Sequence, residues 1–367
     1  MKVTLYAVGD TSPIHEPIGP YSDLIRDALS AADLRFCAAE RPYSERGTPQ
    51  PGSGAVGKPV PPHMASVFDD CGFDVVSIAS NHIMDFGPEA MLDTRDLLRA
   101  KGIAAIGVGE NLEEASRATF IDRNGLRIAF LSFCSVLKEG CAAEAGKAGV
   151  APMRASTTFQ PSSSEPGAPA RVLTVPDPTD LANMVGHIAA ARREADVVVL
   201  SLHWGVAFIP RLVADYQKAV ADAAVAAGAD VILGHHPHAP RAIGMHAGKA
   251  CFYSLGNFII TSDFLGGDPA RIAAFEREKG IRLDPDYPRL PYGTDAKRSL
   301  LAKLVLAKTG IDRISFVPMW IDPKNRPFLL QGSDPRFAEN AAFMEWVSEG
   351  FPHRFSLDGD EIAVLPV

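Results

Sequence analysis

ADVVVLSLHWG (Ala195–Gly205) and ADVILGHHPH (Ala229–His238) are the two stretches that decide the fold. Each is an almost continuous apolar run with histidine at its end, and such runs are typical of strands buried on both faces of a sheet. Between them, LVADYQKAVADAAVAAG (Leu212–Gly228) has the apolar spacing of a helix and ends at a glycine. A strand, a helix and a second strand in this order predict an α/β fold.

The same alternation continues through most of the chain. Strand-like runs occur at residues 2–8, 34–40 and 73–80, and PEAMLDTRDLLRAKG (88–102) is punctuated as a helix by a proline and a glycine. We predict a single domain over residues 1–367. Two excursions, at about 155–180 and 263–298, interrupt the pattern; each is interpreted either as a lid or substrate wall or as decoration of the surface.

The composition excludes several classes of function. The 367 residues are 47% hydrophobic and 22% charged, with a net charge of −8 and no basic stripe that would suit nucleic acid. The start, MKVTLYAVGD, is not a signal peptide, and no apolar run is long enough to span a membrane. Five scattered cysteines indicate reduced thiols in a cytoplasmic protein. No pattern predicts an oligomeric state.

Potential metal ligands follow one apolar strand after another. They are Asp10, Glu40, Asn81 with His82, His203, and the cluster His235, His236 and His238. Each alone could be a turn residue, an ion pair, a helix cap or a core histidine. Because ligands of open α/β sheets bind at the carboxyl ends of strands, the repetition predicts a site there. Carboxylate, amide and imidazole ligands suit Mn, Fe, Zn or Ca, so we expect one or two divalent ions.

The histidine cluster has an internal order if its backbone is extended. Side chains alternate with a period of two along an extended segment, so His236 and His238 would point the same way. His235 would point the other way and is left out of the predicted ligand set.

Several motifs in this order resemble one known family. They are GD (9–10), Glu40, SNHIMDFG (80–87), HWG (203–205), GHHPH (234–238) and YSLGNF (253–258). From about Val3 to Phe258 the chain resembles the CapA family, named for bacterial capsule and poly-γ-glutamate synthesis proteins, within the calcineurin-like metallophosphoesterase superfamily. The resemblance implies a four-layer α/β/β/α sandwich that carries a binuclear metal centre.

The resemblance also implies roles for the ligands. One metal ion would be held by Asp10 and His238, the other by Asn81, His203 and His236, and both by Glu40 as the bridge. A metal-bound hydroxide would be the nucleophile, because a bound metal brings the pKa of water near neutrality.

The resemblance implies that His82 and Asp85 supply a proton to the reaction. His82 would protonate a leaving group, and Asp85 would orient it, because a carboxylate on one ring nitrogen fixes the tautomer at the other.

Two departures from the superfamily pattern thin the first metal site. Ser12 stands where phosphoesterases of the superfamily carry a histidine, and Ala38 stands where the family usually has asparagine. His15 is a weak candidate for the missing imidazole. A single occupied metal site is therefore an open alternative.

Three functions fit these residues. The first is hydrolysis of a small-molecule or peptide-linked phosphoester. The second is metal-dependent epimerisation of a ribosomally made peptide, such as a lasso-peptide precursor, in which His82–Asp85 and a second pair built on His238 would move a proton at Cα. The third is a non-catalytic component of poly-γ-glutamate synthesis.

Four further residues are candidates for substrate contacts. Arg46 and Lys58 could meet an anionic substrate from the loop at 44–59, Trp204 could line a pocket, and Asn257 could stand near the site. Trp204 also has the ordinary alternative of a core residue.

Overall fold

Two large β-sheets form the centre of the protein. The computed structural model describes residues 1–161, 165, 167–263 and 265–366. The first sheet has the order β19-β20-β17-β16-β1-β2-β3-β4, with β15 beside β1 and β18 beside β17. Its strands are β1 (Val3–Ser12), β2 (Leu34–Ala39), β3 (Val75–Ser77), β4 (Ala104–Ile106), β15 (Asn257–Ile260), β16 (Arg298–Ala307), β17 (Gly310–Ile321), β18 (Pro327–Leu329), β19 (Phe355–Asp358) and β20 (Glu361–Val364).

The second sheet has the order β13-β14-β12-β11-β7-β6. Its strands are β6 (Thr119–Arg123), β7 (Leu126–Cys134), β11 (Val197–His203), β12 (Val231–His235), β13 (Ile243–His246) and β14 (Lys249–Phe252). Strands β7, β11 and β12 run parallel, and α6 (Asp215–Ala227) connects β11 to β12. The βαβ unit predicted from Ala195–His238 is therefore present.

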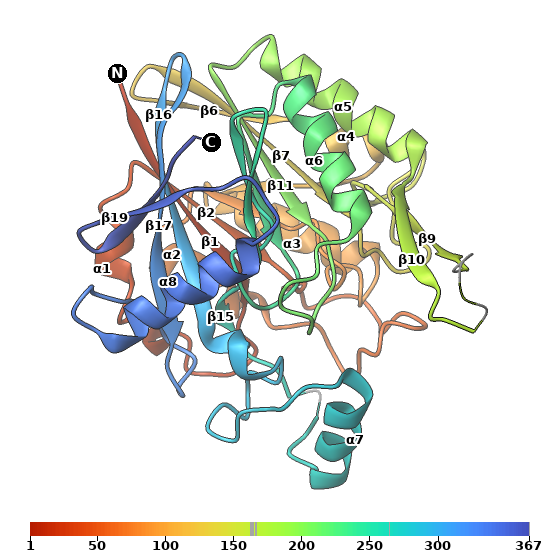
Figure 1. The fold of residues 1–367 in the computed structure, drawn as a ribbon. Helices are drawn as coiled ribbons and strands as arrows, with labels where there is room; N and C mark the ends of the chain where they lie inside the picture. The colour runs from red at the N-terminus through yellow and green to blue at the C-terminus, as the bar shows by residue number, and fades with distance from the viewer. Residues whose placement is uncertain (162–164, 166, 264, 367) are drawn as a thin grey trace.

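Helices α2 (Ser66–Asp70) and α3 (Pro88–Ala100) pack on the outer face of the first sheet, and α5 (Pro178–Arg192) and α6 pack on that of the second. The other helices are α1 (Arg26–Leu29), α4 (Leu112–Ser116), α7 (Pro269–Lys279) and α8 (Pro335–Ser348). Figure 1 shows α1 and α2 on one side of the paired sheets and α5 and α6 on the other.

Three apolar clusters separate the four layers. One lies between the sheets and joins side chains of β1 and β2 to those of β7, β11 and β12. A second packs the first sheet against α2 and α3, and a third packs the second sheet against α5 and α6. The fold is the predicted four-layer α/β/β/α sandwich, because each sheet buries one face against its partner and the other against helices.

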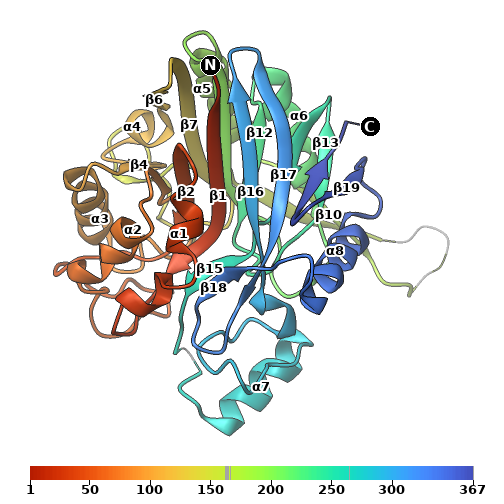
Figure 2. The same cartoon turned by 90° about the vertical axis from the view of Figure 1, so that its left-hand side faces the viewer.

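The two excursions carry secondary structure of their own. Strands β9 (Ala155–Gln160) and β10 (Arg171–Pro176) form an antiparallel hairpin in the first excursion. The second contains α7, which extends below the body in both views (Figures 1 and 2). The Asp268 side chain caps this helix by accepting from the Ala270 N–H at 2.8 Å, and Pro269 follows it.

Two predictions from composition can be compared with the structure directly. All five cysteines are buried and unpaired. Within the described ranges, no helix is both long and apolar enough to cross a bilayer.

Candidate metal centre

The carboxylates of Asp10 and Glu40 lie at the carboxyl ends of β1 and β2. Both are buried, at 0% and 1% exposed. A glycine makes this arrangement possible: a Cβ on Gly9 would lie 1.9 Å from the carbonyl oxygen of Gly256. Glycine therefore lets β15 approach β1, where Asp10 pairs with Asn257.

Ser12 and Ser80 hold the backbone around Glu40. The Ser12 hydroxyl accepts from the N–H groups of Glu40 and Arg41, both at 3.0 Å, and the Ser80 hydroxyl donates to the Glu40 carbonyl at 2.7 Å. Ser12, which stands where the resemblance implies a histidine, thus holds the backbone that carries the Glu40 side chain.

His203 ends β11 and faces both carboxylates. Its Nδ1 lies 3.9 Å from Asp10 Oδ1, and its Nε2 lies 3.7 Å from Glu40 Oε1. The same Nε2 is 2.9 Å from Asn81 Oδ1. Two ligands bound at right angles to one ion, at about 2.1 Å each, are about 3 Å apart. The His203–Asn81 spacing therefore fits two ligands of one metal ion.

His236 and His238 lie in a turn after β12, not in an extended segment. Both have positive φ, 97° and 57°, a conformation that non-glycine residues adopt at a cost. The alternation argument was therefore wrong in its premise. The turn still brings both rings to Glu40: His238 Nε2 lies 3.5 Å from Glu40 Oε1, and the two ring centroids are 6.0 Å apart.

His235, the last residue of β12, also reaches the cluster. Its Nδ1 lies 3.8 Å from Asp10 Oδ1, its ring centroid is 5.8 Å from that of Phe36, and it is 0% exposed. Among the described residues, neither of its nitrogens has a hydrogen-bond partner. The sequence argument placed this side chain away from the site, and the structure places it against Asp10.

The donor atoms gather into two groups that share Glu40. Atoms of Glu40, His236 and His238 lie within 4.8 Å of one another, and so do atoms of Asp10, Glu40 and His203. This partition differs from the one that the resemblance implies, in which Asp10 goes with His238. Asp10 Oδ2 is nevertheless only 3.8 Å from His238 Nδ1, so Asp10 touches both groups.

Burial gives these groups the protonation tendencies of a cation site. Burial, reinforced by the Glu40 carboxylate, raises the pKa of Asp10 well above its usual value, and burial also raises the pKa of Glu40. Burial lowers the pKa of His203 well below its usual value and that of His238 to about 4. Neutral imidazoles are the form that binds metal, and a cation between buried carboxylates would favour their ionised form.

The hydrogen bonds left unmade point the same way. In the described part of the chain, Asp10 Oδ1, both Glu40 carboxylate oxygens, His203 Nδ1 and His236 Nδ1 are buried without a hydrogen-bond partner. Buried polar atoms are rarely left unpaired in native structures. These atoms are of the ligand types that hold Mn, Fe, Zn or Ca, so the residues present fit a divalent metal ion.

His82 and Asp85 stand beside this cluster and contact each other. His82 Nδ1 is 2.7 Å from Asp85 Oδ2, and the His82 side chain is 31% exposed, against 1% for Glu40 and 7% for His238. Lys138, which the sequence analysis missed, donates to Asp85 Oδ1. Its Nζ also lies 3.5 Å from His82 Nδ1 and 3.2 Å from the Ser53 carbonyl. The pair is therefore a triad that includes a lysine.

Asn257 and Trp204 have structural roles in place of the predicted substrate contacts. Asn257 is 0% exposed; its Oδ1 lies 2.9 Å from His238 Nδ1, and its amide nitrogen donates to the His238 carbonyl at 2.8 Å. It orients a candidate ligand. Trp204 is also fully buried, stacked on Tyr253, and donates to the Tyr253 carbonyl at 3.0 Å. Because no surface of Trp204 is free, the prediction that it lines a pocket is wrong.

The remaining candidates lie outside the cluster. Arg46 donates to both oxygens of Asp93, so its charge is already compensated and the predicted substrate contact has no support here. Lys58 is exposed on the same loop, and its role stays a prediction. His15 contacts Thr261 and Asp263 through its two nitrogens and does not replace the missing imidazole.

The chain is similar in sequence to known proteins. The family profile described as "Bacterial capsule synthesis protein PGA_cap" matches residues 7–262. "PGA biosynthesis protein CapA" of Bacillus subtilis is 34% identical over 196 residues, which are 53% of this chain and 44% of that protein. "Capsule biosynthesis protein CapA" of Bacillus anthracis is 30% identical over 194 residues, 52% of this chain and 41% of that protein. The matches thus span less than half the length of these relatives.

The chain was also compared with a solved structure. The crystal structure of the calcineurin-like phosphoesterase YfkN from Bacillus subtilis aligns over 95% of this chain and 100% of that chain, with a TM-score of 0.42 and 12% identity.

Proposed function

The chain belongs to the family described as bacterial capsule synthesis protein PGA_cap, and we propose that it is a metal-dependent phosphoesterase of the calcineurin-like kind. The observation that carries the proposal is the convergence of buried donor atoms on Glu40. Among the described residues, both of its carboxylate oxygens lack a hydrogen-bond partner, while His203 and His238 approach one of them within 3.7 Å.

The proposed ligand set follows the sequence analysis. Glu40, which belongs to both groups of donor atoms, would hold the metal together with Asp10, Asn81, His203, His236 and His238. A metal ion bound there supplies charge to hold phosphate oxygens and lowers the pKa of water. Asn257 keeps His238 Nδ1 engaged, which leaves Nε2 directed at Glu40 and available as the ligand atom.

His82 would move the proton of the reaction. Its Nδ1 is bound to Asp85, so Nε2 is the nitrogen left to face a substrate. In hydrolysis a bond forms between phosphorus and the oxygen of water, and that water loses one proton to solvent. The bond to the leaving oxygen breaks, His82 gives that oxygen a proton, and solvent returns a proton to His82. Lys138 holds Asp85 from the other side and so positions His82 without touching the substrate.

The epimerase alternative has one of the two pairs it needs. His82–Asp85 could act on one face of a Cα. The hydrogen-bond partner of His238 Nδ1 is the Asn257 amide, and the carboxylates near His238, those of Asp10 and Glu40, belong to the proposed ligand set. A non-catalytic role in polymer synthesis would not require a complete set of buried donors. Hydrolysis therefore uses more of the observed geometry than either alternative.

Metal content tests the proposal first. Protein purified without chelator, and a His236→Ala variant beside it, are analysed by mass spectrometry for Mn, Fe, Zn and Ca. Two equivalents in the wild type, reduced in the variant, support the binuclear site. One equivalent favours the mononuclear alternative. No metal in either sample, and none taken up on addition, contradicts the proposal.

Turnover then separates the reactions. With Mn²⁺ added, the proposal expects release of phosphate or alcohol from at least one member of a panel of phosphomonoesters and phosphodiesters. Incorporation of deuterium at a peptide Cα in D₂O, without hydrolysis across the panel, would establish the epimerase alternative instead.

A further inference from the structure

A cavity of about 190 Å³ opens beside His238. Pro237 and Ala239, the neighbours of His238 in the chain, line it, and so does Tyr292, whose ring stacks on His238 with centroids 3.8 Å apart. Its volume is below the roughly 300–1,000 Å³ of pockets that enclose a whole small ligand. The cavity therefore has the size of a compartment for part of a substrate.

Arg241 lines this cavity and is buried without a charged partner. The residue is 2% exposed. Its Nη1 and Nη2 reach only the carbonyl oxygens of Pro240 and Val206, at 3.5 and 3.4 Å. Its Nε has no hydrogen-bond partner among the described residues, and no carboxylate of that part of the chain forms an ion pair with it. A buried charge in this state destabilises the fold.

The charge of Arg241 persists at neutral pH. Burial lowers the pKa of Arg241 to about 10, and the nearby Asp295 opposes this effect. Asp295, which also lines the cavity, is itself engaged by Arg298, whose Nε donates to Oδ1 at 3.2 Å. The Asp295 carboxylate is thus shared with Arg298. The guanidinium of Arg241 therefore stays positive and has no carboxylate of its own.

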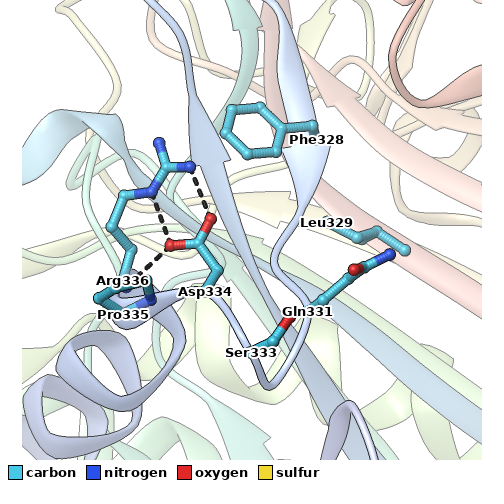
Figure 3. Close-up of a pocket in the computed structure, with 7 residues that line it drawn as sticks. All are labelled: Phe328, Leu329, Gln331, Ser333, Asp334, Pro335 and Arg336. Atoms are coloured by element: carbon cyan, nitrogen blue, oxygen red, sulfur yellow. Dashed lines mark hydrogen bonds and ion pairs between the residues drawn. The ribbon is translucent and has the colours of Figure 1, made fainter.

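A second pocket shows what a satisfied arginine looks like in this protein. Arg336 lines a cavity near α8, and there Asp334 accepts from its Nε at 3.0 Å and from its Nη2 at 2.6 Å (Figure 3). Arg336 is also more exposed, at 40% for the side chain. Arg336 is therefore paired with a carboxylate even near the surface, whereas Arg241 is buried and its Nε has no hydrogen-bond partner among the described residues.

We propose that the cavity beside His238 is an oxyanion subsite, in which Arg241 binds a carboxylate or phosphate substituent of the substrate next to the group held at the metal centre. The inference rests on the proposed function, because both groups would belong to one molecule. It assigns the substrate to a chemical class: molecules with a second negative group close to the reacting one.

The excursion at 263–298 supplies the far wall of this subsite. Two parts of the excursion line the cavity. The first is the segment 280–282, directly after α7, and the second is the segment 292–295, which includes the start of η3 (Thr294–Lys297). We therefore interpret this excursion as a substrate wall and not as decoration of the surface. Loops placed on a rigid scaffold commonly determine which ligand is accepted.

Anion binding to the full-length protein tests the subsite without any turnover. Glutarate and inorganic phosphate are titrated by calorimetry into the protein loaded with Mn²⁺ and into the protein after treatment with a chelator. We expect at least one probe to bind the chelated protein, and Arg241→Met to weaken that binding by more than about tenfold, as loss of a charged hydrogen-bond donor does. Arg241→Lys, which keeps the charge, should retain part of it.

The probe that binds identifies the source of the oxyanion. Preference for glutarate indicates a carboxylate substituent, and preference for phosphate indicates a second phosphate group. Arg336→Met is the matched control: it also removes an arginine from the wall of a cavity, and it should bind both probes like the wild type.

Thermal unfolding checks that the Arg241→Met variant is folded, so that its anion binding can be compared with that of the wild type. Because Arg241 carries an unpaired buried charge, Arg241→Met should unfold at the same temperature as the wild type or higher; if it fails to fold, Arg241→Gln takes its place. Equal probe binding by wild type and Arg241→Met, or no binding of either probe by the chelated wild type, would overturn the subsite. Its failure is distinguishable from that of the hydrolase proposal, which depends on metal content and not on anion binding by metal-free protein.

Discussion

The metal-ligand cluster and the oxyanion subsite lie on two sides of His238, yet they are built in opposite ways. Asp10 and His203 stand at the ends of parallel strands, where ladder hydrogen bonds fix their positions. The subsite is enclosed by segments distant in sequence, the turn that contains Arg241 and the loop at 280–295. In this proposal, the strands of the two sheets position the metal ligands, and the excursion at 263–298 determines which substrate binds beside them.

The largest effect should come from Glu40, the residue shared by both donor groups. Glu40→Gln removes the bridging charge, so we expect loss of bound metal and a fall in turnover well beyond the roughly 10–100-fold typical of residues that only support a ligand. Stabilisation by Mn²⁺, about 2.7 kcal/mol at a hundred times Kd, should shrink with it. Metal analysis and melting curves with and without Mn²⁺ measure both effects.

The control for this variant is a glutamate on the surface. Glu110→Gln alters an exposed side chain, 68% accessible, near Arg95, and should change neither metal content nor turnover. A Glu40→Gln protein with full metal and full turnover would show that the cluster is not the reaction centre.

The next largest effect should come from His82, which stands beside the metal-ligand cluster in contact with Asp85. His82→Gln removes the proposed acid, so turnover should fall about 10²–10⁴-fold while metal content stays unchanged. The loss should be smaller for a p-nitrophenyl ester than for an alkyl ester, because p-nitrophenolate leaves without help from an acid. Equal losses on the two esters, or loss of metal, would rule out the acid role.

The site residues at the ends of strands were predictable from the sequence, and the geometry of those on turns and loops was not. Asp10, Glu40 and His203 follow apolar runs that identify strands, and parallel strands share a carboxyl edge. The φ values of His236 and His238 have no such signal, because a turn of non-glycine residues looks like an extended run. Lys138 and Arg241 were missed for a related reason: they reach the site from loops, and only the folded chain shows what they contact.

A smaller effect should come from Lys138, which supports His82 through Asp85. Lys138→Met leaves one Asp85 oxygen without its charged partner, so we expect turnover to fall about tenfold, at the low end for a positioning residue. Lys138→Arg, which can still donate to Asp85, should recover part of the loss. Steady-state kinetics should show the change in kcat with little change in KM.

The matched control is Lys147→Met, which removes a lysine that is 42% exposed beside Glu144 and should leave kcat unchanged. If Lys138→Met matches the wild type, Asp85 positions His82 alone and the triad is a pair.

The smallest effect should come from His235, neither of whose ring nitrogens has a hydrogen-bond partner among the described residues. Burial lowers its pKa to about 3, far below the usual 6.5, so the folded state holds fewer protons than the unfolded state between these values. The stabilising effect is complete above pH 6.5 and is lost as the pH falls toward 3, at about 1.4 kcal/mol per pH unit. Because burial also lowers the pKa values of His203, His236 and His238, the contribution of His235 is the difference between metal-free wild type and His235→Phe in urea unfolding at pH 7 and pH 5.5.

His235→Phe shows whether this residue is a metal ligand or a buried neighbour of the cluster. The new ring can pack against Phe36 and needs no hydrogen bond, so stability at pH 7 should be unchanged or higher, and the pH dependence should decrease by one proton. If metal content also stays unchanged, His235 is a buried neighbour of Asp10, and its exclusion from the ligand set holds although the alternation behind it does not. If metal is lost, its Nδ1, 3.8 Å from Asp10 Oδ1, is a ligand atom. In that case β12 and the turn after it provide three histidine ligands, and the imidazole missing at Ser12 is supplied by the second sheet.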